Sequence, residues 1–410
     1  MTASSTVEFL IWLLIAASAI SVLAERMRIP YTVALVLAGL CLSLINLHAL
    51  SPLQPGQRLN WLTPDVILIL FLPALIFEGS IKLRWRELRR DSVPLLLLAN
   101  AGVLLAALVT GCLVRLTVGL PMLTAMVFGA IISATDPISV LALFRALAID
   151  KRLSIIIEGE SLLNDGTAVV LFQILLGGLA AGKLEIARGV GQFVYAVVGG
   201  AALGSAMGYA VSRITRTIDD PEVEITLTTI AAYGSYLLAF HLHLSGVIAT
   251  GAAGLVVGNF GARRGMSPRT RAALESFWEY LAFVINSLVF LLIGLEVHMQ
   301  SVFRDWRPLI FAIASVLIGR AVSVYSLVPI SNAFAQTISG RWQHVIVWGG
   351  LRGALALALA LSVDSGFPHR QQLLDLVFGV VVFSILVQGL TIKPLLRVLG
   401  LAESEANPPA

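Results

Sequence analysis

Long apolar runs separated by short polar stretches recur along the chain from Val7 to Leu399. A helix that crosses a membrane needs about 20 apolar residues, whereas a strand of a membrane β-barrel needs about 10 residues that alternate in polarity. The runs are too long and too uniformly apolar for barrel strands, so they predict an all-α polytopic membrane protein. Thirteen spanning helices are expected, at 7–24, 30–47, 65–80, 93–116, 121–147, 153–180, 189–213, 222–240, 243–260, 274–297, 307–331, 341–363 and 371–398.

The composition agrees with a chain surrounded by lipid. Of the 410 residues, 58% are hydrophobic and 13% are charged, whereas soluble domains carry about 25% charged residues. A soluble core of this size cannot bury so much apolar surface, which excludes a soluble enzyme, a nucleic-acid binder and a disordered chain. The two cysteines, Cys41 and Cys112, lie inside apolar runs and predict neither a disulfide framework nor a metal site.

The basic residues are distributed unevenly between alternate connections of the predicted helices. One set of connections holds nineteen Lys and Arg residues and the other set holds seven. Cytoplasmic connections carry the excess of Lys and Arg in membrane proteins, so the first set is expected inside. With thirteen helices, the N-terminus is then outside and the C-terminus is cytoplasmic. The net charge of +4 is explained by anionic lipid, and no nucleic-acid partner is expected.

The sixth predicted helix contains the most polar stretch of any apolar run, Glu158–Gly166. Ser161 and Asp165 are four residues apart and therefore share one helix face. Asp165 lies twelve residues past Leu153, which is about 18 Å along a helix and near the middle of a hydrocarbon core about 30 Å thick. A carboxylate at that depth is expensive and indicates function; the alternative is a buried polar cluster that only holds helices together.

Two predicted helices are interrupted by residues that break helical geometry. The fifth contains Ser133–Pro137, and the twelfth contains Trp348–Gly353 with Arg352 in its middle. Proline frees backbone carbonyls, which is tolerated at membrane depth only inside protein or beside a cavity. The two helices are seven apart in order and run in opposite directions, as the paired broken helices of inverted-repeat transporters do. A simple proline kink is the alternative for the fifth helix alone.

Further charges lie within or near the ends of apolar runs. Arg320 is deep in the eleventh predicted helix and needs a counter-charge, for which Asp136 or Glu158 is expected. Glu78 and Glu158 lie near helix ends, where the alternative for each is a carboxylate that reaches the membrane surface. Asp136 and Arg352 are expected to offset the dipoles of the half-helices at the two breaks.

Three segments carry a resemblance to a known family: Ala134–Pro137, Glu158–Gly166 and Gly350–Ala354. They resemble NhaP-type sodium/proton antiporters of the monovalent cation:proton antiporter-1 family, to which the animal sodium/proton exchangers also belong. The resemblance implies an NhaA-like inverted-repeat fold whose broken helices 5 and 12 cross. It also implies a homodimer, with a dimerisation domain at 1–92 and 189–300, a moving core domain at 93–188 and 301–400, and a short cytoplasmic tail at 401–410.

The same resemblance assigns roles to individual residues. It implies that Asp165 carries the cation or the proton in turn, that Ser161, the Thr135 backbone and Glu78 complete the Na⁺ site, and that Asn164 orients it. Glu160 and Arg352 are expected to form a stabilising ion pair between helices six and twelve. Asparagine at position 164, where electrogenic antiporters have a second aspartate, resembles the electroneutral branch of these transporters.

The expected function is electroneutral exchange of Na⁺ or Li⁺ for H⁺ across the cell's inner (plasma) membrane. No cofactor, no catalytic residue and no obligate soluble partner are expected. A K⁺/H⁺ antiporter of the same fold is the main alternative. Two others are less well supported: a cation channel, and an intramembrane protease with Asp136 and Asp165 as its acidic pair, which would need the two carboxylates close together.

Overall fold

The computed structural model describes residues 3–27, 29–44, 66–180, 185–263, 265–296 and 306–402, and every regular element in these ranges is helical. The last eight residues of the predicted tail, 403–410, lie outside this part of the chain. The helices are α1 (Ala3–Met27), α2 (Tyr31–Leu44), α3 (Leu72–Lys82), α4 (Trp85–Arg90), α5 (Ser92–Leu96), α6 (Val103–Val118), α7 (Met122–Ser133), α8 (Ile138–Ala146), α9 (Lys151–Ala180), α10 (Ile186–Ile214), α11 (Pro221–His241), α12 (Gly246–Val256), α13 (Pro268–Glu296), α15 (Trp306–Asn332), α16 (Gly340–Trp348), α17 (Ala354–Leu361), α18 (Arg370–Phe383) and α19 (Gly389–Val398).

Short turns of wider or tighter helix join several of these helices into longer rods. Wider turns, with π-type geometry, lie at Val66–Phe71, Leu97–Gly102, Val257–Gly261 and Ser384–Gln388, and a 3₁₀ turn follows α10 at Thr215–Thr217. Eight helical stretches in the described residues are long and apolar enough to cross a membrane, and the shorter helices Tyr31–Leu42 and Gly246–Gly261 are also apolar. The all-helical membrane architecture is therefore confirmed, while the number of thirteen crossings stays a prediction.

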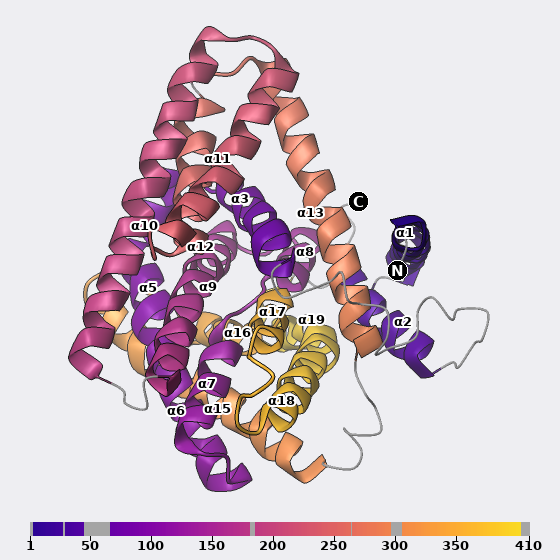
Figure 1. Ribbon diagram of the computed structural model, residues 1–410, viewed down its shortest axis with the longest axis vertical. Helices are drawn as coiled ribbons and strands as arrows, with labels where there is room; N and C mark the ends of the chain where they lie inside the picture. Colours follow the sequence, from indigo (N-terminus) through magenta and orange to yellow (C-terminus); the bar gives the residue numbers. More distant parts are fainter. Residues whose placement is uncertain are drawn as a thin grey trace.

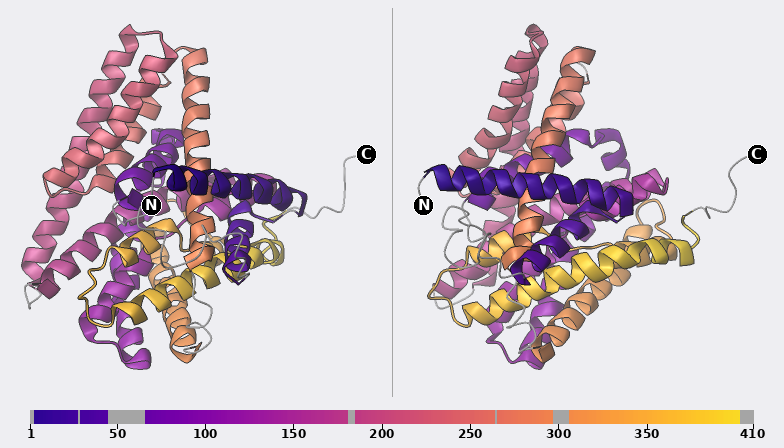
Figure 2. Two further views of the ribbon diagram at one scale, coloured as in Figure 1. Left: turned by 45° about the vertical axis from the view of Figure 1, so that its right-hand side comes forward. Right: turned by 90° about the vertical axis from the view of Figure 1, so that its right-hand side faces the viewer.

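The helices pack in two groups that meet near α3 and α9. In Figure 1, α11 and α12 lie in the upper part of the molecule and α10 runs beside them along the left edge, whereas α6, α7 and α15–α19 lie in the lower part. Within the groups, α10 packs on α12, and α6 packs on both α7 and α15, while α13 packs along α2. Figure 2 shows α1 lying across the molecule, where it contacts α2 and α13.

The contact between α10 and α12 depends on glycine. A Cβ atom at Gly204 would collide with the backbone of Ala249, and one at Gly208 would lie 2.7 Å from the carbonyl oxygen of Ala253. Without a hydrophobic driving force between helices in lipid, small residues that let backbones approach are a main source of helix packing. These glycines therefore hold the upper group of helices together.

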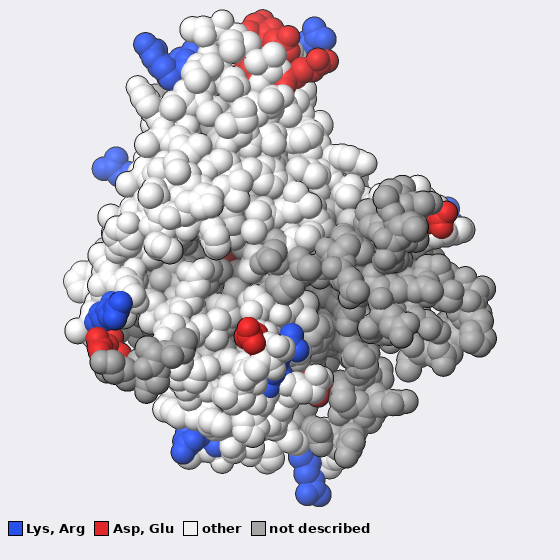
Figure 3. Space-filling view, in the orientation of Figure 1, with Lys and Arg blue, Asp and Glu red and all other residues white. Residues whose placement is uncertain are grey.

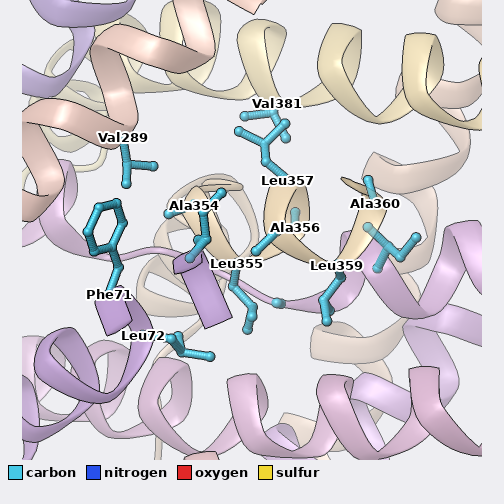
Figure 4. Close-up of a cluster of buried hydrophobic side chains, with 14 of the residues drawn as sticks. Phe71, Leu72, Val289, Ala354, Leu355, Ala356, Leu357, Leu359, Ala360 and Val381 are labelled. Carbon is cyan, nitrogen blue, oxygen red and sulfur yellow. The ribbon is translucent and has the colours of Figure 1, made fainter. Parts of the chain in front are cut away.

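α17 lies in the centre of the molecule. Its eight residues alternate Ala and Leu, and all but the last are buried. Figure 4 shows Leu355, Leu357 and Leu359 of α17 among Phe71, Leu72, Val289 and Val381, which come from three other segments of the chain: the start of α3, α13 and α18. A helix that is apolar on every side is buried on every side, so the break that precedes α17 is held in the middle of the protein.

The surface agrees with lipid contact. In Figure 3 a wide, nearly uncharged surface separates the charged side chains at the top of the view, where α10 and α11 meet, from charged groups in the lower half. Large apolar side chains face outward on these helices, among them Val194 and Tyr209 of α10 and Ile230 of α11. In water such a surface would aggregate, whereas in a bilayer it is the stable arrangement.

Candidate functional site

α9 presents a polar face at the middle of its length. Asp165 is the fifteenth of the thirty residues of this helix, and Ser161 lies one turn earlier on the same face. Ser161 is buried and Asp165 is half-buried, and both line a cavity of about 350 Å³. Within the described part of the chain, no hydrogen bond to the Asp165 carboxylate is found, so its oxygens are available to a ligand in the cavity.

The predicted interruption of the fifth apolar range is confirmed between α7 and α8. α7 ends at Ser133, and α8 begins at Ile138 after Pro137. The backbone N–H of Ile138 donates to Asp136 Oδ1 at 2.9 Å. A carboxylate there satisfies one of the free N–H groups of the helix start, in a position that the helix dipole favours.

The second predicted interruption is also confirmed, and the two breaks meet. The backbone N–H of Asp136 donates to the carbonyl oxygen of Leu351 at 2.8 Å, which joins the α7–α8 break to the α16–α17 break. A Cβ atom at Gly353 would collide with the carboxyl group of Asp136. The two segments therefore approach as closely as they do because position 353 carries no side chain.

Arg352 links the second break to the end of α7. Its Nη1 donates to the carbonyl oxygens of Ser133 and Ala134, at 3.0 Å each, and its backbone N–H donates to Ser384 Oγ at 2.9 Å. The last carbonyls of a helix have no partner inside the helix and carry partial negative charge. A buried guanidinium satisfies both needs, so Arg352 offsets the dipole of the half-helix α7.

The ion pair of Glu160 is not the expected one. Glu160 is held by Arg320, whose Nη1 and Nη2 donate to the two carboxylate oxygens at 2.8 Å each. Arg320 Nη2 also donates to the carbonyl oxygen of Ile346 at 3.1 Å. Asp136 or Glu158 was expected to pair with Arg320, and this prediction is wrong. The expected Glu160–Arg352 pair is also replaced, because Arg352 is occupied by the carbonyls of α7.

The Asn164 side chain bonds to the break between α7 and α8, and not to the Asp165 carboxylate. Its Nδ2 donates to Thr135 Oγ1 at 2.6 Å and to Glu160 Oε1 at 3.1 Å, and its Oδ1 accepts from the backbone N–H of Thr135 at 3.3 Å. Ser161 Oγ donates to the Thr135 carbonyl oxygen. Two side chains of α9 therefore fix the unwound backbone at Thr135.

The cavity separates the predicted site residues into two sets. One set lines the cavity: Glu78, Thr135, Asp136, Glu158, Ser161 and Asp165. The other set is buried behind the cavity wall: Glu160, Asn164, Arg320 and Arg352. The first set can touch a bound ion, whereas the second can only position the residues that do.

Glu78 lies in the cavity but already has a cationic partner. Lys82, one turn further along α3, pairs with Glu78 and lies 2.8 Å from Glu279 of α13. A cation that binds Glu78 must compete with the ammonium group of Lys82. Glu158 lines both this cavity and a neighbouring one that also contains Lys82 and Arg145, so it too belongs to the charged end of the site.

The polar residues of the cavity that the sequence did not point to are Tyr31, Lys82, Arg145, Glu279 and Asn286, and of these Asn286 of α13 is the one with an unsatisfied oxygen among the described residues. Its side chain lines the cavity and is only 5% exposed, and its Oδ1 has no hydrogen-bond partner among the described residues. An unsatisfied buried acceptor costs about 1–3 kcal/mol, so a water molecule or a cation in the cavity is its natural partner. The signal in the sequence was a lone amide inside the apolar run Phe283–Phe290.

The donor atoms at the cavity suit a small hard cation. The Asp165 carboxylate, Ser161 Oγ, the Thr135 carbonyl and Asn286 Oδ1 are all oxygens, which hard cations prefer over nitrogen or sulfur. In the parts of the chain that the structure describes, no group of three or more His, Cys, Asp or Glu side chains could hold a metal ion. The cavity therefore offers mixed side-chain and backbone oxygens around a single central carboxylate.

A helical membrane protein in which two broken helices meet beside a cavity-lining carboxylate has the architecture of a secondary ion transporter. The family model described as sodium/hydrogen exchanger, transmembrane, matches residues 13–398. The chain therefore belongs to the sodium/hydrogen exchanger family.

Individual relatives agree with this family. The Na⁺/H⁺ antiporter ApNhaP of Aphanothece halophytica is 42% identical over 93% of this chain and 71% of its own length. The antiporter NhaP of Pseudomonas aeruginosa is 38% identical over 90% of this chain and 91% of its own. The solved antiporter MjNhaP1 of Methanocaldococcus jannaschii matches 98% of this chain and 100% of its own with a TM-score of 0.76 at 19% identity, which shows a common fold.

Proposed function

We propose that this protein exchanges one Na⁺ for one H⁺ and that Asp165 carries each of them in turn. The observation that carries the proposal is the position of Asp165, which lines the cavity beside Ser161 and the unwound backbone at Thr135. Relatives named Na⁺/H⁺ antiporters, which match most of the chain, favour Na⁺ over K⁺.

The proposed Na⁺ site uses oxygens from two sides of the cavity. The ionised Asp165 supplies the charge, and Ser161 and the Thr135 carbonyl supply neutral oxygens from α9 and the α7–α8 break. Asn286 Oδ1, unpartnered in the cavity, supplies a further oxygen from α13. Glu78 takes part only when Na⁺ displaces Lys82 from its carboxylate.

Coupling follows from the cost of moving an unpaired charge. An ionised carboxylate without a cation is costly to carry through a low-dielectric region, so the site changes sides only with Na⁺ or with a proton on Asp165. Each complete cycle then moves one positive charge in each direction and no net charge. Exchange with this stoichiometry is electroneutral.

The residues behind the cavity act as positioning residues. Asn164 fixes Thr135, and the Arg320–Glu160 pair fixes Asn164 through its bond to Glu160 Oε1. Arg352 and Asp136 neutralise the ends of the half-helices. Because Asn164, Glu160 and Arg320 form one hydrogen-bonded chain to Thr135, and Arg352 and Asp136 hold the backbone on either side of it, a change at any of the five is expected to shift the Thr135 carbonyl relative to Asp165.

The proposed assembly is a homodimer in the plasma membrane, with the N-terminus outside and the C-terminus in the cytoplasm. Residues 1–92 and 189–300 would form the dimerisation domain, and 93–188 and 301–400 the moving core. Packing of α10 on α12 within the first set, and of α6 on α7 and α15 within the second, supports this division. The cavity lies between the two sets, because Glu78 and Asn286 belong to the first and Asp165 to the second.

Everted membrane vesicles from cells without their own exchangers test the proposal. A pH-sensitive dye reports proton movement when Na⁺, Li⁺ or K⁺ is added, and Asp165→Asn is expected to abolish the response to Na⁺. Glu222→Gln, which changes an exposed carboxylate of α11, is the matched control and is expected to exchange normally. Normal exchange by Asp165→Asn would disprove the role of Asp165.

The same assay decides between the proposal and its alternatives. A larger response to K⁺ than to Na⁺ would establish the K⁺/H⁺ antiporter. A Na⁺ current without proton movement in patch recordings would establish a channel. For electroneutral exchange, clamping the membrane potential at different values is expected to leave the exchange rate unchanged.

A further inference from the structure

A second large cavity lies on the opposite side of α9 from the ion cavity. It has a volume of about 670 Å³, within the range of about 300–1,000 Å³ that is typical of ligand sites, and lies between α5 and α9 on one side and α10 and α12 on the other. Figure 1 shows these helices next to one another in the left half of the molecule. None of the residues assigned to ion transport above lines this cavity.

The body of this cavity is apolar and open to the surroundings. Leu96 of α5, which is 54% exposed, lines it together with Leu163 of α9 and Ile248 and Val256 of α12. On a surface that faces lipid, an open apolar cavity of this size is filled by hydrocarbon rather than by water. The occupant therefore has at least one acyl chain.

One rim of the cavity is polar and basic. Trp85, which is 49% exposed, and Arg89, which is also exposed, both come from α4 and line the cavity with Ser92 and Asn259. The backbone N–H of Trp85 donates to Asn259 Oδ1 at 2.9 Å, which ties the start of α4 to the turn that follows α12. The rim is thus a fixed part of the fold.

The Arg89 guanidinium is available to a ligand. In the described residues, no hydrogen bond or ion pair of the Arg89 side chain is found, whereas the neighbouring Arg90 donates to Gln336 at 2.9 Å. A guanidinium binds phosphate oxygens with two parallel hydrogen bonds. Tryptophan is enriched at the depth of lipid headgroups.

We propose that this cavity binds one anionic phospholipid, with an acyl chain between α9 and α12 and the phosphate on Arg89. Charge selects the headgroup, because among the described residues the rim offers a free guanidinium and hydrogen-bond donors and the lining contains no carboxylate. Shape and polarity select a lipid over a soluble phosphate, because most of the binding surface is the apolar body.

The site has a consequence for transport that rests on the proposed function. Leu162 of α9 lines both cavities, while Gly159 and Leu163 line the lipid cavity alone and Ser161 and Asp165 the ion cavity alone. The lipid therefore packs on the reverse face of the helix that carries the ion site. α9 belongs to the proposed moving core and α12 to the proposed dimerisation domain. The lipid therefore lies at the interface along which the two domains would move.

Native mass spectrometry of the full-length protein tests lipid binding without any assay of transport. The protein is purified in detergent and incubated with phosphatidylglycerol or phosphatidylcholine of the same chain length. Wild-type protein is expected to retain phosphatidylglycerol preferentially. Arg89→Ala is expected to reduce this retention about fivefold, the effect of one basic residue at an anionic surface. The matched control is Arg86→Ala, which removes an exposed arginine of the same helix that does not line the cavity and is expected to retain the lipid.

Three results would overturn the proposal. Equal retention of both lipids would exclude charge selection, and equal weakening by Arg86→Ala and Arg89→Ala would indicate general attraction to α4. Displacement of the lipid by inorganic phosphate would show a site for soluble anions. Ala252→Trp, which fills the apolar body, provides a second variant and is expected to lose phosphatidylglycerol while Arg89 is intact.

Exchange in liposomes then tests the consequence for transport. Wild-type exchange is expected to change when phosphatidylglycerol replaces phosphatidylcholine, and Arg89→Ala is expected to lose this lipid dependence. If binding is confirmed but the Na⁺/H⁺ exchange itself is absent from every liposome, the lipid site stands and the proposed function fails. If exchange is present but independent of the lipid, the link between the two cavities is disproved.

Discussion

Arg320 binds both carboxylate oxygens of Glu160, although the two residues are 160 positions apart in the chain. Both side chains are buried, at 6% and 1% exposure. The pair joins α15 to α9 one turn before the ion site. It is therefore a buried charged link between α15 and the helix that carries Asp165.

Breaking this pair is expected to destabilise the protein strongly. Arg320→Ala leaves Glu160 as an unpaired buried charge, which costs about 3–5 kcal/mol, and unfolding of the purified protein in detergent should begin at a clearly lower temperature. The matched control is Lys151→Ala, because Lys151 and Glu87 form an exposed pair worth about 0–1 kcal/mol. An Arg320→Ala protein as stable as this control would contradict the role assigned to the pair.

Gly353 is expected to tolerate no side chain. Gly353→Ala adds a Cβ that collides with the Asp136 carboxyl group, so the two breaks must separate, at a cost of about 1–3 kcal/mol. Exchange in everted vesicles is expected to fall steeply while the protein is still inserted. Gly177→Ala in α9 is the control, since no atom lies within 4 Å of its added Cβ; a similar loss in both variants would refute the steric argument.

Asn286 is expected to affect Na⁺ binding more than turnover. Asn286→Ala removes one cation ligand, worth about 0.5–1.5 kcal/mol, so the KM for Na⁺ should rise about two- to tenfold with little change in the maximal rate. Ser287→Ala is the control, because this neighbouring hydroxyl is also buried and has no hydrogen-bond partner in the described part of the chain, but does not line the cavity. A reduced maximal rate at unchanged KM would place Asn286 outside the site.

Competition between Na⁺ and H⁺ for one carboxylate predicts a specific pH dependence. Protonation of Asp165 removes the form that binds Na⁺, so the apparent KM for Na⁺ should increase as the pH falls, by at most about tenfold per pH unit. At saturating Na⁺ the effect should disappear. An apparent KM that is independent of pH, measured with the dye assay at a series of fixed pH values, would mean that the proton and Na⁺ bind to different groups.

Local features of the sequence predicted several elements correctly. The two interruptions lie where Pro137 and the glycines of Trp348–Gly353 predicted them, because helix breaking depends on a few neighbouring residues. Asp165 and Ser161 share a face because helical periodicity dictates it. These predictions needed no knowledge of which helices are neighbours.

Predictions about partners between distant segments were less successful. The partner of Arg320 could not be identified from positions in the sequence. Glu160, Asp136 and Glu158 all lie in polar parts of apolar runs, so each of them was an equally suitable counter-charge. Asn164 was expected to orient the ion site, and its hydrogen bonds to the backbone and side chain of Thr135 could not be deduced from the sequence. Asn286 and the partner of Glu78, Lys82, became visible as parts of the site only when α3, α9 and α13 were placed around one cavity.

The amino-acid sequence alone determined that the chain is a helical membrane protein and where two of its helices break. Hydrophobic periodicity, proline and glycine act within a few residues, and so these properties can be deduced from short stretches. The tertiary structure decided which charges pair, which oxygens line the cavity beside Asp165 and where a second cavity opens beside α9. Those properties depend on contacts between residues more than a hundred positions apart, and only the packing of the helices brings such residues together.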